Sequence, residues 1–402
     1  MTTTTPEAVP AGSEWRPLVD SDIGIMRRFF RGRRWYGAEW YITVFGALIL
    51  VTVLLTTLLA PIIAPHDPNE FIGAPFTAPG HGLQALLVRK GESPIRAGDD
   101  LAGDHLAGKA IGTQRNKNGA VWTKEKGIER RRYDKQEEMI AALERGEVDI
   151  IFIGAEWLDG VLAANPGLEM VQKGIGRRYW LGTNNLGQDA TSRLIWGART
   201  ILLVAVMSAL FSSLVGIPLG LTSAFVGGKL DKVLSLVLDS IYSFPGLLLA
   251  VALAAMLGPS LINVTIAISV VYVPTFFRIV RGQVLSIKEN TYIEAARSIG
   301  ARPHTILFSY IFPNVMPSVV VLFSLNIADA ILTSAGLTFI GLGLPPDIPD
   351  WGYDLNKGHQ YVVAGHWWMI TFPGIMITLV AAGFSLLGEG LSEILNPRLV
   401  KS

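Results

Sequence analysis

Long uncharged apolar runs alternate with short polar segments along most of this chain. A helix needs about 20 apolar residues to cross the hydrocarbon core of a bilayer, because each residue adds about 1.5 Å to its length. By that measure the sequence predicts six membrane spans, of which the third and the fifth each carry one carboxylate. Their approximate limits are Tyr41–Ala64, Thr200–Phe225, Val233–Leu257, Leu261–Val280, Ile311–Leu332 and Trp368–Leu387. We therefore expect an all-α polytopic membrane protein.

Composition supports a membrane protein and excludes several other classes. Half of the 402 residues are hydrophobic and only 17% are charged, which is too apolar for a soluble protein of this size. The formal net charge of +1 gives no electrostatic reason to expect nucleic acid as a partner. Cysteine is absent, so disulfides, thiolate catalysis and cysteine metal ligands are excluded. The six histidines are scattered without ligand spacing, so no metal site is predicted.

Basic residues near the ends of the spans predict the orientation. Short cytoplasmic segments of membrane proteins are enriched in Lys and Arg. Five arginines precede the first span, which places residues 1–40 in the cytoplasm: Arg27, Arg28, Arg31, Arg33 and Arg34. Six spans then return the tail, residues 391–402 with Arg398 and Lys401, to the same side of the cell membrane. We expect no cleaved signal peptide, because the first apolar run begins near residue 41 and has the length of a full span.

The region between the first two spans, residues 65–199, differs in composition and is expected outside the cytoplasm. From Arg89 to Arg178, 31 of 90 residues are charged, as in a soluble domain. At about 95–175 the pattern predicts a small α/β insert. A short strand within Leu106–Thr113 precedes an amphipathic helix at Tyr133–Arg145. The apolar, β-branched run Val148–Gly154 is typical of a strand in a parallel sheet.

A glycine-containing segment in the insert approximates a phosphate-binding loop but does not qualify as one. Gly103–Lys109 has the required glycines and lysine, yet Ala110 replaces the hydroxyl residue that would bind Mg²⁺. The glycines also precede the predicted strand, whereas in a phosphate-binding loop they follow it. We therefore predict that this chain binds no nucleotide and no cofactor of its own.

A short motif lies in the cytoplasmic connection 281–310 between the fourth and fifth spans. Tyr292–Ser298 predicts a short helix, in which Ala295 and Ala296 are small enough to enter a partner's groove. Glu294 and Arg297 would then make charged contacts at the rim of that groove. Gly300 permits a sharp turn, and Pro303, after Ala301, suits the first turn of a second helix. An ordinary amphipathic cytoplasmic loop explains these residues equally well.

The spacing Glu-Ala-Ala-x3-Gly, formed by Glu294, Ala295, Ala296 and Gly300, resembles the signature loop of permease subunits in ATP-binding-cassette importers. Ala60–Asn69 and Leu181–Asp189 resemble the dipeptide, oligopeptide and nickel branch of that family, and its second permease subunit in particular. The resemblance implies a permease core at 200–390 that moves peptides or related small solutes by alternating access. It further implies that the segment at 294–303 is the coupling helix, which docks on an ATPase. The residues expected to make this contact are Glu294, Ala295, Ala296, Arg297, Gly300, Ala301 and Pro303.

The same resemblance implies which partners complete the transporter. They are a homologous permease subunit, two ATP-binding subunits that hold ATP and Mg²⁺, an extracytoplasmic solute-binding protein and the membrane lipid. This chain would then be a transport subunit without hydrolytic activity of its own. The leading alternative is a membrane receptor or sensor that uses the external domain, although a receptor would normally have fewer spans and a cytoplasmic output domain. A membrane-embedded hydrolase is the other alternative, but no nucleophile–base cluster supports it.

Part of the insert, about Asp99–Lys173, resembles one lobe of periplasmic solute-binding proteins of the amino-acid-binding type. That family usually has a Gly-Ser/Thr-Thr turn that holds the substrate carboxylate. This chain has Arg115–Gly119 at that place. We therefore expect a structural or docking role for the insert in preference to ligand capture.

Polar residues inside the predicted spans are candidates for the translocation path. Asp239 and Asp329 are costly in hydrocarbon, so they should face the bundle interior, a partner subunit or water. Alternatively, each is a buried group bonded to a neighbour, for which Asn326, Ser243 and Tyr242 are candidates. Pro245 should kink the third span, either as a hinge or as an ordinary packing kink.

Overall fold

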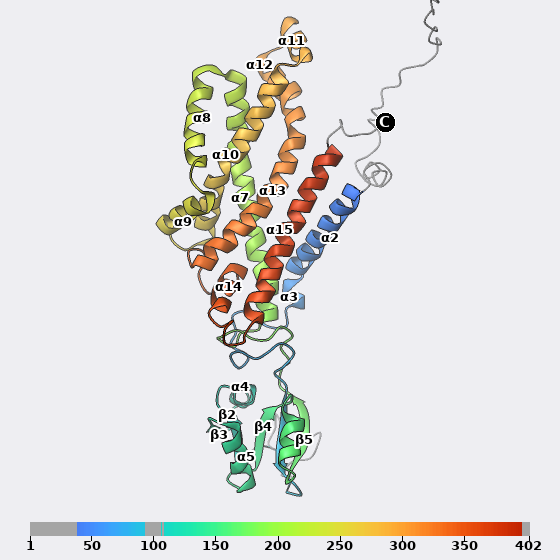
Figure 1. Cartoon of the computed structure of the whole chain (residues 1–402), viewed down its shortest axis with the longest axis vertical. Helices are drawn as coiled ribbons and strands as arrows, with labels where there is room; N and C mark the ends of the chain where they lie inside the picture. The colour runs from blue at the N-terminus through green and yellow to red at the C-terminus, as the bar shows by residue number, and fades with distance from the viewer. Residues whose placement is uncertain (1–37, 93–105, 107, 396–402) are drawn as a thin grey trace, which may run out of the picture.

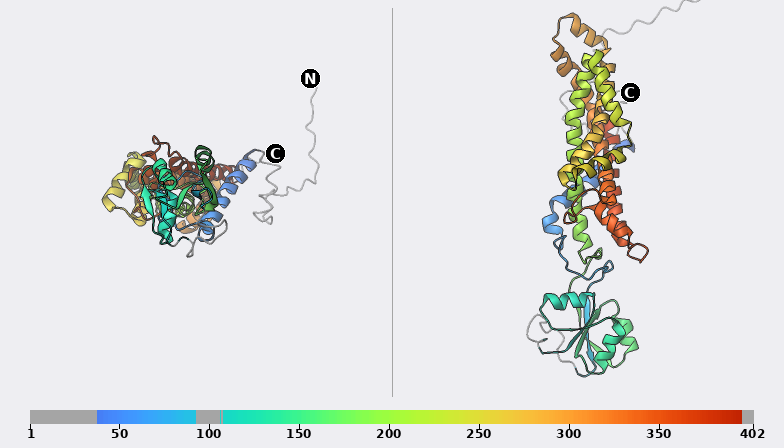
Figure 2. Two further views of the ribbon diagram at one scale, coloured as in Figure 1. Left: turned by 90° about the horizontal axis from the view of Figure 1, so that it is seen from below. Right: turned by 90° about the vertical axis from the view of Figure 1, so that its left-hand side faces the viewer.

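The structure, a computed structural model, describes residues 38–92, 106 and 108–395. A long helical bundle and a small α/β domain lie end to end, and the chain passes between them through two extended connections (Figure 1 and Figure 2). The arginines that predicted the orientation of the N-terminus, the basic tail residues and most of the glycine-containing segment at 103–109 lie outside the described residues.

The bundle contains the helices before residue 64 and after residue 189. They are α2 (Ala38–Leu58), α3 (Ala60–Ile63), α7 (Ala190–Val226), α8 (Gly228–Tyr242), α9 (Gly246–Leu257), α10 (Leu261–Lys288), α11 (Thr291–Ser298), α12 (Pro303–Thr305), the π-helical turn η2 (Ile306–Ile311), α13 (Phe312–Ile340), α14 (Trp351–His359) and α15 (Trp368–Leu395). Each of the six predicted spans falls on one or two of these helices.

Among the described residues, five helices are long and apolar enough to cross a membrane, and a sixth crossing exists if α8 and α9 count as one. Helices α8 and α9 meet at an angle of 87°, so the predicted third span is strongly bent at Ser243–Pro245. Several helices also exceed their predicted limits. The 37 residues of α7 extend over about 55 Å, against a hydrocarbon thickness of about 30 Å.

Helices α7 and α10 pack closely because small residues line their contact. A Cβ on Gly216 would lie 2.8 Å from the carbonyl oxygen of Val273, and one on Gly220 would lie 2.8 Å from that of Phe277. Two serines of α7 add interhelical bonds, of which the shorter runs from Ser212 Oγ to the carbonyl oxygen of Ser269 at 2.9 Å. Small residues at such spacing let the backbones of membrane helices approach each other. The α7–α10 pair therefore forms the rigid centre of the bundle.

The α/β domain, which we call the insert domain, spans residues 84–175. Its elements are β1 (Gln84–Arg89), β2 (Ile111–Gln114), α4 (Asn118–Glu125), β3 (Arg131–Tyr133), α5 (Gln136–Glu144), β4 (Ile150–Gly154), α6 (Leu158–Ala164) and β5 (Leu168–Ile175). The strand order is β3-β2-β4-β1-β5, and one apolar cluster packs on each face of the sheet.

The insert domain has a mixed sheet, and its first residue differs from the expected limit. The sheet is mixed, because β2 pairs in parallel with β3 and β4, whereas β1 runs antiparallel to both β4 and β5. The domain also begins at Gln84, before the expected limit near residue 95, because β1 fills the gap between β4 and β5. The predicted helix and the second predicted strand are present as α5 and β4, and the first strand is confined to β2.

The connections between the insert domain and the bundle are packed and not free linkers. Arg193, only 2% exposed, binds Asp354 of α14 at 2.9 Å and also contacts the carbonyl oxygen of Pro68. Trp368 Nε1 donates to the carbonyl oxygen of Thr183 at 3.1 Å. Burial raises the pKa of the Asp354 carboxyl, although Arg193 acts in the opposite direction. These contacts tie both connections to the ends of α7, α14 and α15 that lie nearest the insert domain.

Candidate functional site

The Glu-Ala-Ala-x3-Gly motif that begins at Glu294 lies at the tip of the bundle farthest from the insert domain (Figure 1). Helix α10 ends at Lys288, and α11 follows after a two-residue break (Figure 1). The chain then turns at Gly300, and Pro303 opens α12 as predicted before the chain continues through η2 into α13. We call residues 291–305 the coupling loop.

Gly300 ends α11 in a conformation that only glycine adopts easily. Its φ is +81°, and its N–H donates to the carbonyl oxygen of Arg297 at 3.0 Å. The N–H of Ala301 donates to the carbonyl oxygen of Ala296, also at 3.0 Å. These two bonds form the Schellman motif, which satisfies the free carbonyls at the end of a helix. The sharp turn expected at Gly300 is therefore present.

Helix α11 has an inner and an outer face. Ile293 and Ala296 are buried, and Ile293 joins an apolar cluster with residues of α7, α10 and α13. The outer face, formed by Tyr292, Ala295 and Ile299, is apolar and exposed, with Ile299 83% accessible. Ala296 is thus unavailable to a partner's groove, because it packs inside this chain, and of the two alanines only Ala295 is accessible.

The charged residues of the coupling loop surround the outer face of α11. Glu294 and Arg297 are both exposed, as the sequence suggested. Ala301 is half-buried and packs against the same apolar cluster as Ile293. The coupling loop therefore offers a small apolar surface with Glu294 and Arg297 beside it, and Arg302 is exposed after the turn at Gly300.

Sequence reasoning missed a polar cluster at the base of the coupling loop. Asp231, in the first turn of α8, accepts two bonds from Arg281 of α10, at 2.6 and 2.7 Å. Ser223 of α7 donates a third bond to the same carboxylate at 2.6 Å. Lys288, the last residue of α10, binds two carbonyl oxygens at the end of α7, with the shorter distance 3.1 Å. We call this cluster the clasp, since it joins α7, α8 and α10.

The clasp gave no local signal in the sequence, because Asp231 and Arg281 lie 50 residues apart. A second ion pair joins the same two helices, α8 and α10, and its basic residue lies inside the fourth predicted span. Arg278 binds Asp239 at 2.7 Å, and its guanidinium lies 4.0 Å from the ring centre of Tyr242. Neither of the two bonding partners considered for Asp239, Ser243 or Tyr242, therefore accounts for its carboxylate.

Asp329 and Pro245 lie away from the coupling loop. Asp329 is exposed on α13, and within the described part of the chain we find no hydrogen bond or ion pair to its carboxylate. Asn326, considered as a partner, is buried with its own Oδ1 unbonded. Pro245 precedes α9 at the 87° bend, so the expected kink is present.

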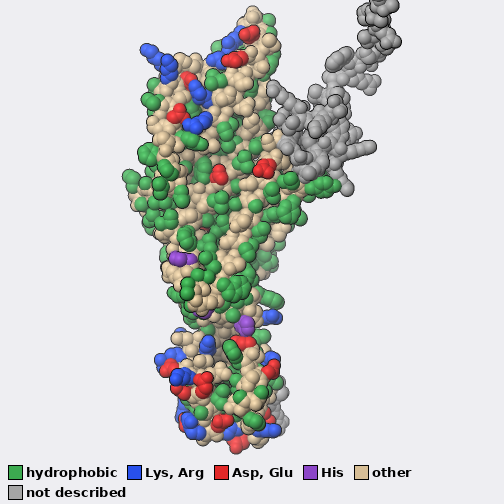
Figure 3. Space-filling model, viewed as in Figure 1, with side chains coloured by type: hydrophobic (Ala, Val, Ile, Leu, Met, Phe, Trp, Pro, Cys, Tyr) green, Lys and Arg blue, Asp and Glu red, His purple; other side chains and the backbone are tan. Residues whose placement is uncertain are grey.

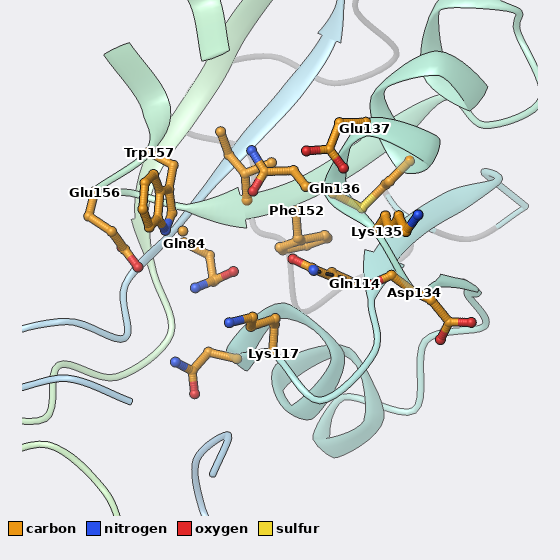
Figure 4. Close-up of a pocket in the computed structure, with 14 residues that line it drawn as sticks. Gln84, Gln114, Lys117, Asp134, Lys135, Gln136, Glu137, Phe152, Glu156 and Trp157 are labelled. Carbon is orange, nitrogen blue, oxygen red and sulfur yellow. Dashed lines mark hydrogen bonds between the residues drawn. The ribbon is translucent and has the colours of Figure 1, made fainter. Parts of the chain in front are cut away.

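The insert domain contains a second candidate site, a cavity of about 340 Å³ at one edge of its sheet (Figure 4). Gln114 at the end of β2, Gly154 at the end of β4 and Lys117 before α4 line it. Throughout the described residues, no group of three or more His, Cys, Asp or Glu side chains has an arrangement that could hold a metal ion.

Comparison with known proteins identifies the helical bundle. Residues 216–401 match the family described as the inner membrane component of binding-protein-dependent transport systems. The glutathione transport system permease protein GsiD of Pectobacterium atrosepticum is 40% identical over 232 residues, which are 58% of this chain and 76% of that protein. This chain belongs to the same permease family. The resemblance first based on Glu294–Gly300 is thereby confirmed, and the receptor and hydrolase alternatives lose their support.

A second relative agrees with that assignment. The dipeptide transport system permease protein DppC of Alkalihalophilus pseudofirmus is 37% identical over 227 residues, or 56% of this chain and 74% of the relative. Among solved structures, an inward-facing MetNI methionine ABC transporter aligns with 51% of this chain and 96% of its own, at 19% identity and a TM-score of 0.44. An arginine-bound ArgBP of T. maritima aligns with 24% of this chain and 43% of its own, at 23% identity and a TM-score of 0.20.

Proposed function

We propose that this permease is a transmembrane subunit of an ATP-driven importer of short peptides or related small solutes. Membership of the permease family supports transport, and the relatives' transport of glutathione and of dipeptides supports a peptide-like solute. Its partners would be a homologous permease subunit, two ATP-binding subunits that hold ATP and Mg²⁺, and an extracytoplasmic solute-binding protein.

The outer face of α11 is the proposed contact with an ATP-binding subunit. The single observation that carries this proposal is an exposed apolar stripe at the tip of a membrane protein. Tyr292, Ala295 and Ile299 are exposed there, although the opposite side of the same helix is fully packed. An apolar stripe of this kind on a short helix is a common mode of docking into a partner's groove. Glu294 and Arg297 would fix its orientation through charged contacts.

The proposed orientation places the coupling loop in the cytoplasm and the insert domain outside. Basic side chains gather at the end of the bundle that carries α11, and the insert domain is rich in both charges (Figure 3). The surface between them is mostly uncharged, as a lipid-facing belt requires. Arg297 and Arg302 of the coupling loop are exposed, and so are Lys229 and Lys232 at the start of α8. Basic residues at this end support its placement in the cytoplasm.

Two kinds of contact would transmit a movement of α11 to the part of the bundle that opens and closes the translocation path, which we call the gate. Ile293 lies in one apolar cluster with α7, α10 and α13, so these elements should move together. Helix α8 has few buried residues and is held to α10 by the Asp231–Arg281 and Asp239–Arg278 pairs. We propose that α8 and α9 form the moving part of the gate and that Pro245 is its hinge.

Asp239, Arg278 and Asp329 are proposed to line the translocation path. All three are exposed in the isolated chain. Charged side chains inside a membrane almost always face a partner or water, because exposure to lipid is costly. A path lined by carboxylates and a guanidinium would suit a solute that carries both an ammonium and a carboxylate group.

Charge reversal at Arg297 tests the coupling contact. We expect Arg297→Glu and the bulky Ala295→Trp to weaken copurification of the ATP-binding subunit and to reduce uptake of peptide in proportion. Lys229→Glu is the matched control, because Lys229 is exposed at the same end but belongs to α8. Normal association and uptake in both coupling-loop variants would refute the proposed contact.

A further inference from the structure

The cavity of the insert domain lies on the side from which the chain enters and leaves that domain. Gln84, at the start of β1, pairs with Gly154 at the end of β4 and with Ile175 at the end of β5. Two parallel strands, β2 and β4, also end at this edge. Ligands of α/β sheets bind preferentially at the carboxyl ends of parallel strands, where helices begin. The location of the cavity therefore fits a binding site.

One part of the cavity is electropositive. Helices α4 and α5 both begin at its wall, and neither has a side-chain cap on its first N–H groups. Lysines occupy the residue before each helix, Lys117 and Lys135, and both line the cavity. Free N–H groups and the helix dipole at such ends favour a carboxylate or another anion.

An unsatisfied acceptor points into the same cavity. Gln84 is only 4% exposed, and its Nε2 donates to the carbonyl oxygens of Gly82 and Leu83. No described residue donates to its Oε1. The carboxamide lies between the side chains of Trp157, Phe152 and Lys117 (Figure 4). This carbonyl oxygen borders the cavity and is free to accept a hydrogen bond from a ligand or from water.

The acidic side chains of the cavity supply the complementary charge. Asp134 is already paired with Arg115, at 3.1 Å. Glu137 and Glu156 also line the cavity and have no ion-pair partner among the described residues. Two free carboxylates thus accompany Lys117 and Lys135. A cavity lined by equal numbers of free positive and negative groups suits a zwitterion better than a simple anion.

The remaining lining is aromatic. Phe152 is buried behind the cavity, and Trp157 is 62% exposed at its rim. Indole and phenyl rings offer an apolar surface for a side chain of the ligand. The volume of about 340 Å³ lies at the lower end of the range for small-molecule sites, about 300–1,000 Å³.

We propose, against the structural or docking role expected from the sequence, that the insert domain binds a short zwitterionic peptide in this cavity. The peptide carboxylate lies at the start of α4 beside Lys117, its ammonium group faces Glu156 or Glu137 and the Gln84 oxygen, and an apolar side chain packs on Trp157. The site would hold solute close to the outer mouth of the permease. The choice of a peptide as the ligand rests on the proposed function. The choice of a zwitterion rests only on the charged side chains of the cavity.

Titration calorimetry of the full chain in lipid nanodiscs tests this proposal with L-alanyl-L-phenylalanine as the probe. We expect binding, and a loss of at least about tenfold in affinity for both the N-acetylated and the C-amidated dipeptide, because each lacks one charged partner. Absence of binding would overturn the proposal. Equal affinity for the capped forms, or for phenylalanine alone, would overturn the assignment to a zwitterionic peptide.

Variants distinguish this cavity from any binding in the translocation path. Lys117→Ala and Trp157→Ala should each weaken binding at least about fivefold, and both residues are exposed, so the fold should persist. Lys124→Ala is the matched control on the same helix, outside the cavity. Unchanged affinity in both cavity variants would exclude this site. The calorimetry needs neither ATP nor an ATP-binding subunit. Absence of peptide binding would therefore refute the site in the insert domain without bearing on the proposed contact between α11 and the ATP-binding subunit.

Discussion

Replacing Gly300 by alanine should destabilise the end of α11 without any steric clash. An added Cβ at this position would meet nothing within 4 Å, but the φ of +81° would remain. For residues other than glycine, the left-handed conformation costs about 1–2 kcal/mol. That free energy corresponds to an increase of roughly 5- to 30-fold in the population of the frayed helix end.

Hydrogen exchange of the N–H groups in 291–301 measures this population directly. We expect faster exchange in Gly300→Ala by about that factor, and a smaller increase in Gly300→Asn, because asparagine tolerates the left-handed conformation. Association with the ATP-binding subunit should weaken in the same order, since the outer face of α11 would be presented less often.

Gly282→Ala is the matched control. Gly282 lies inside α10, and an added Cβ there also meets nothing within 4 Å. Alanine in a helix interior is favoured over glycine by about 1 kcal/mol, so this variant should exchange no faster than the parent protein. If the two alanine variants behaved alike, the conformational explanation for Gly300 would be wrong.

Three further predictions concern other parts of the bundle. Asp231→Asn leaves Arg281 without its bidentate partner, so the unfolding free energy should fall by about 2 kcal/mol in denaturation experiments, and a fall below 0.5 kcal/mol would argue against the clasp. Burial raises the pKa of Asp350, so its contribution to stability is present at acid pH and is lost as pH rises. Asp350→Asn keeps an acceptor for the N–H of Tyr353, and its gain in Tm over the parent should therefore be larger at pH 7 than at pH 4.5. Trp351→Phe removes the 2.8 Å bond from Nε1 to a carbonyl oxygen of α7 and should cost about 1–3 kcal/mol, measured as a fall in thermal stability.

The sequence predicted the spans well because apolar length is a local property. It also placed α5, β4 and the turn at Gly300, each of which depends on neighbouring residues. Strand β1 was missed, because its six residues gain their place only by pairing with β4 and β5, which lie 60 or more residues later. Local patterns do not reveal such distant pairing.

In the candidate site, too, local features were predictable from the sequence and contacts between distant residues were not. The helix and its turn followed from residue types, but the direction of each side chain did not. Ala295 and Ala296 look equivalent in the sequence, and only the packing of Ile293 shows which of them faces inward. The partners of Asp231 and Asp239 lie on α10, 50 and 39 residues away, so neither ion pair was predictable from local spacing.

The distribution of buried residues identifies which part of the bundle is free to move. Only Leu238 is buried in α8, and only Ala250 and Ala254 are buried in α9, whereas α10 packs closely against two glycines of α7, Gly216 and Gly220. Movement within the α7–α10 pair would break close backbone contacts, which cost far more than sliding a lightly packed helix. Conformational change should therefore concentrate in α8 and α9. The clasp fixes the start of α8 to α10, which leads into the coupling loop. The bend at Pro245 leaves α9 free to change its angle to α8.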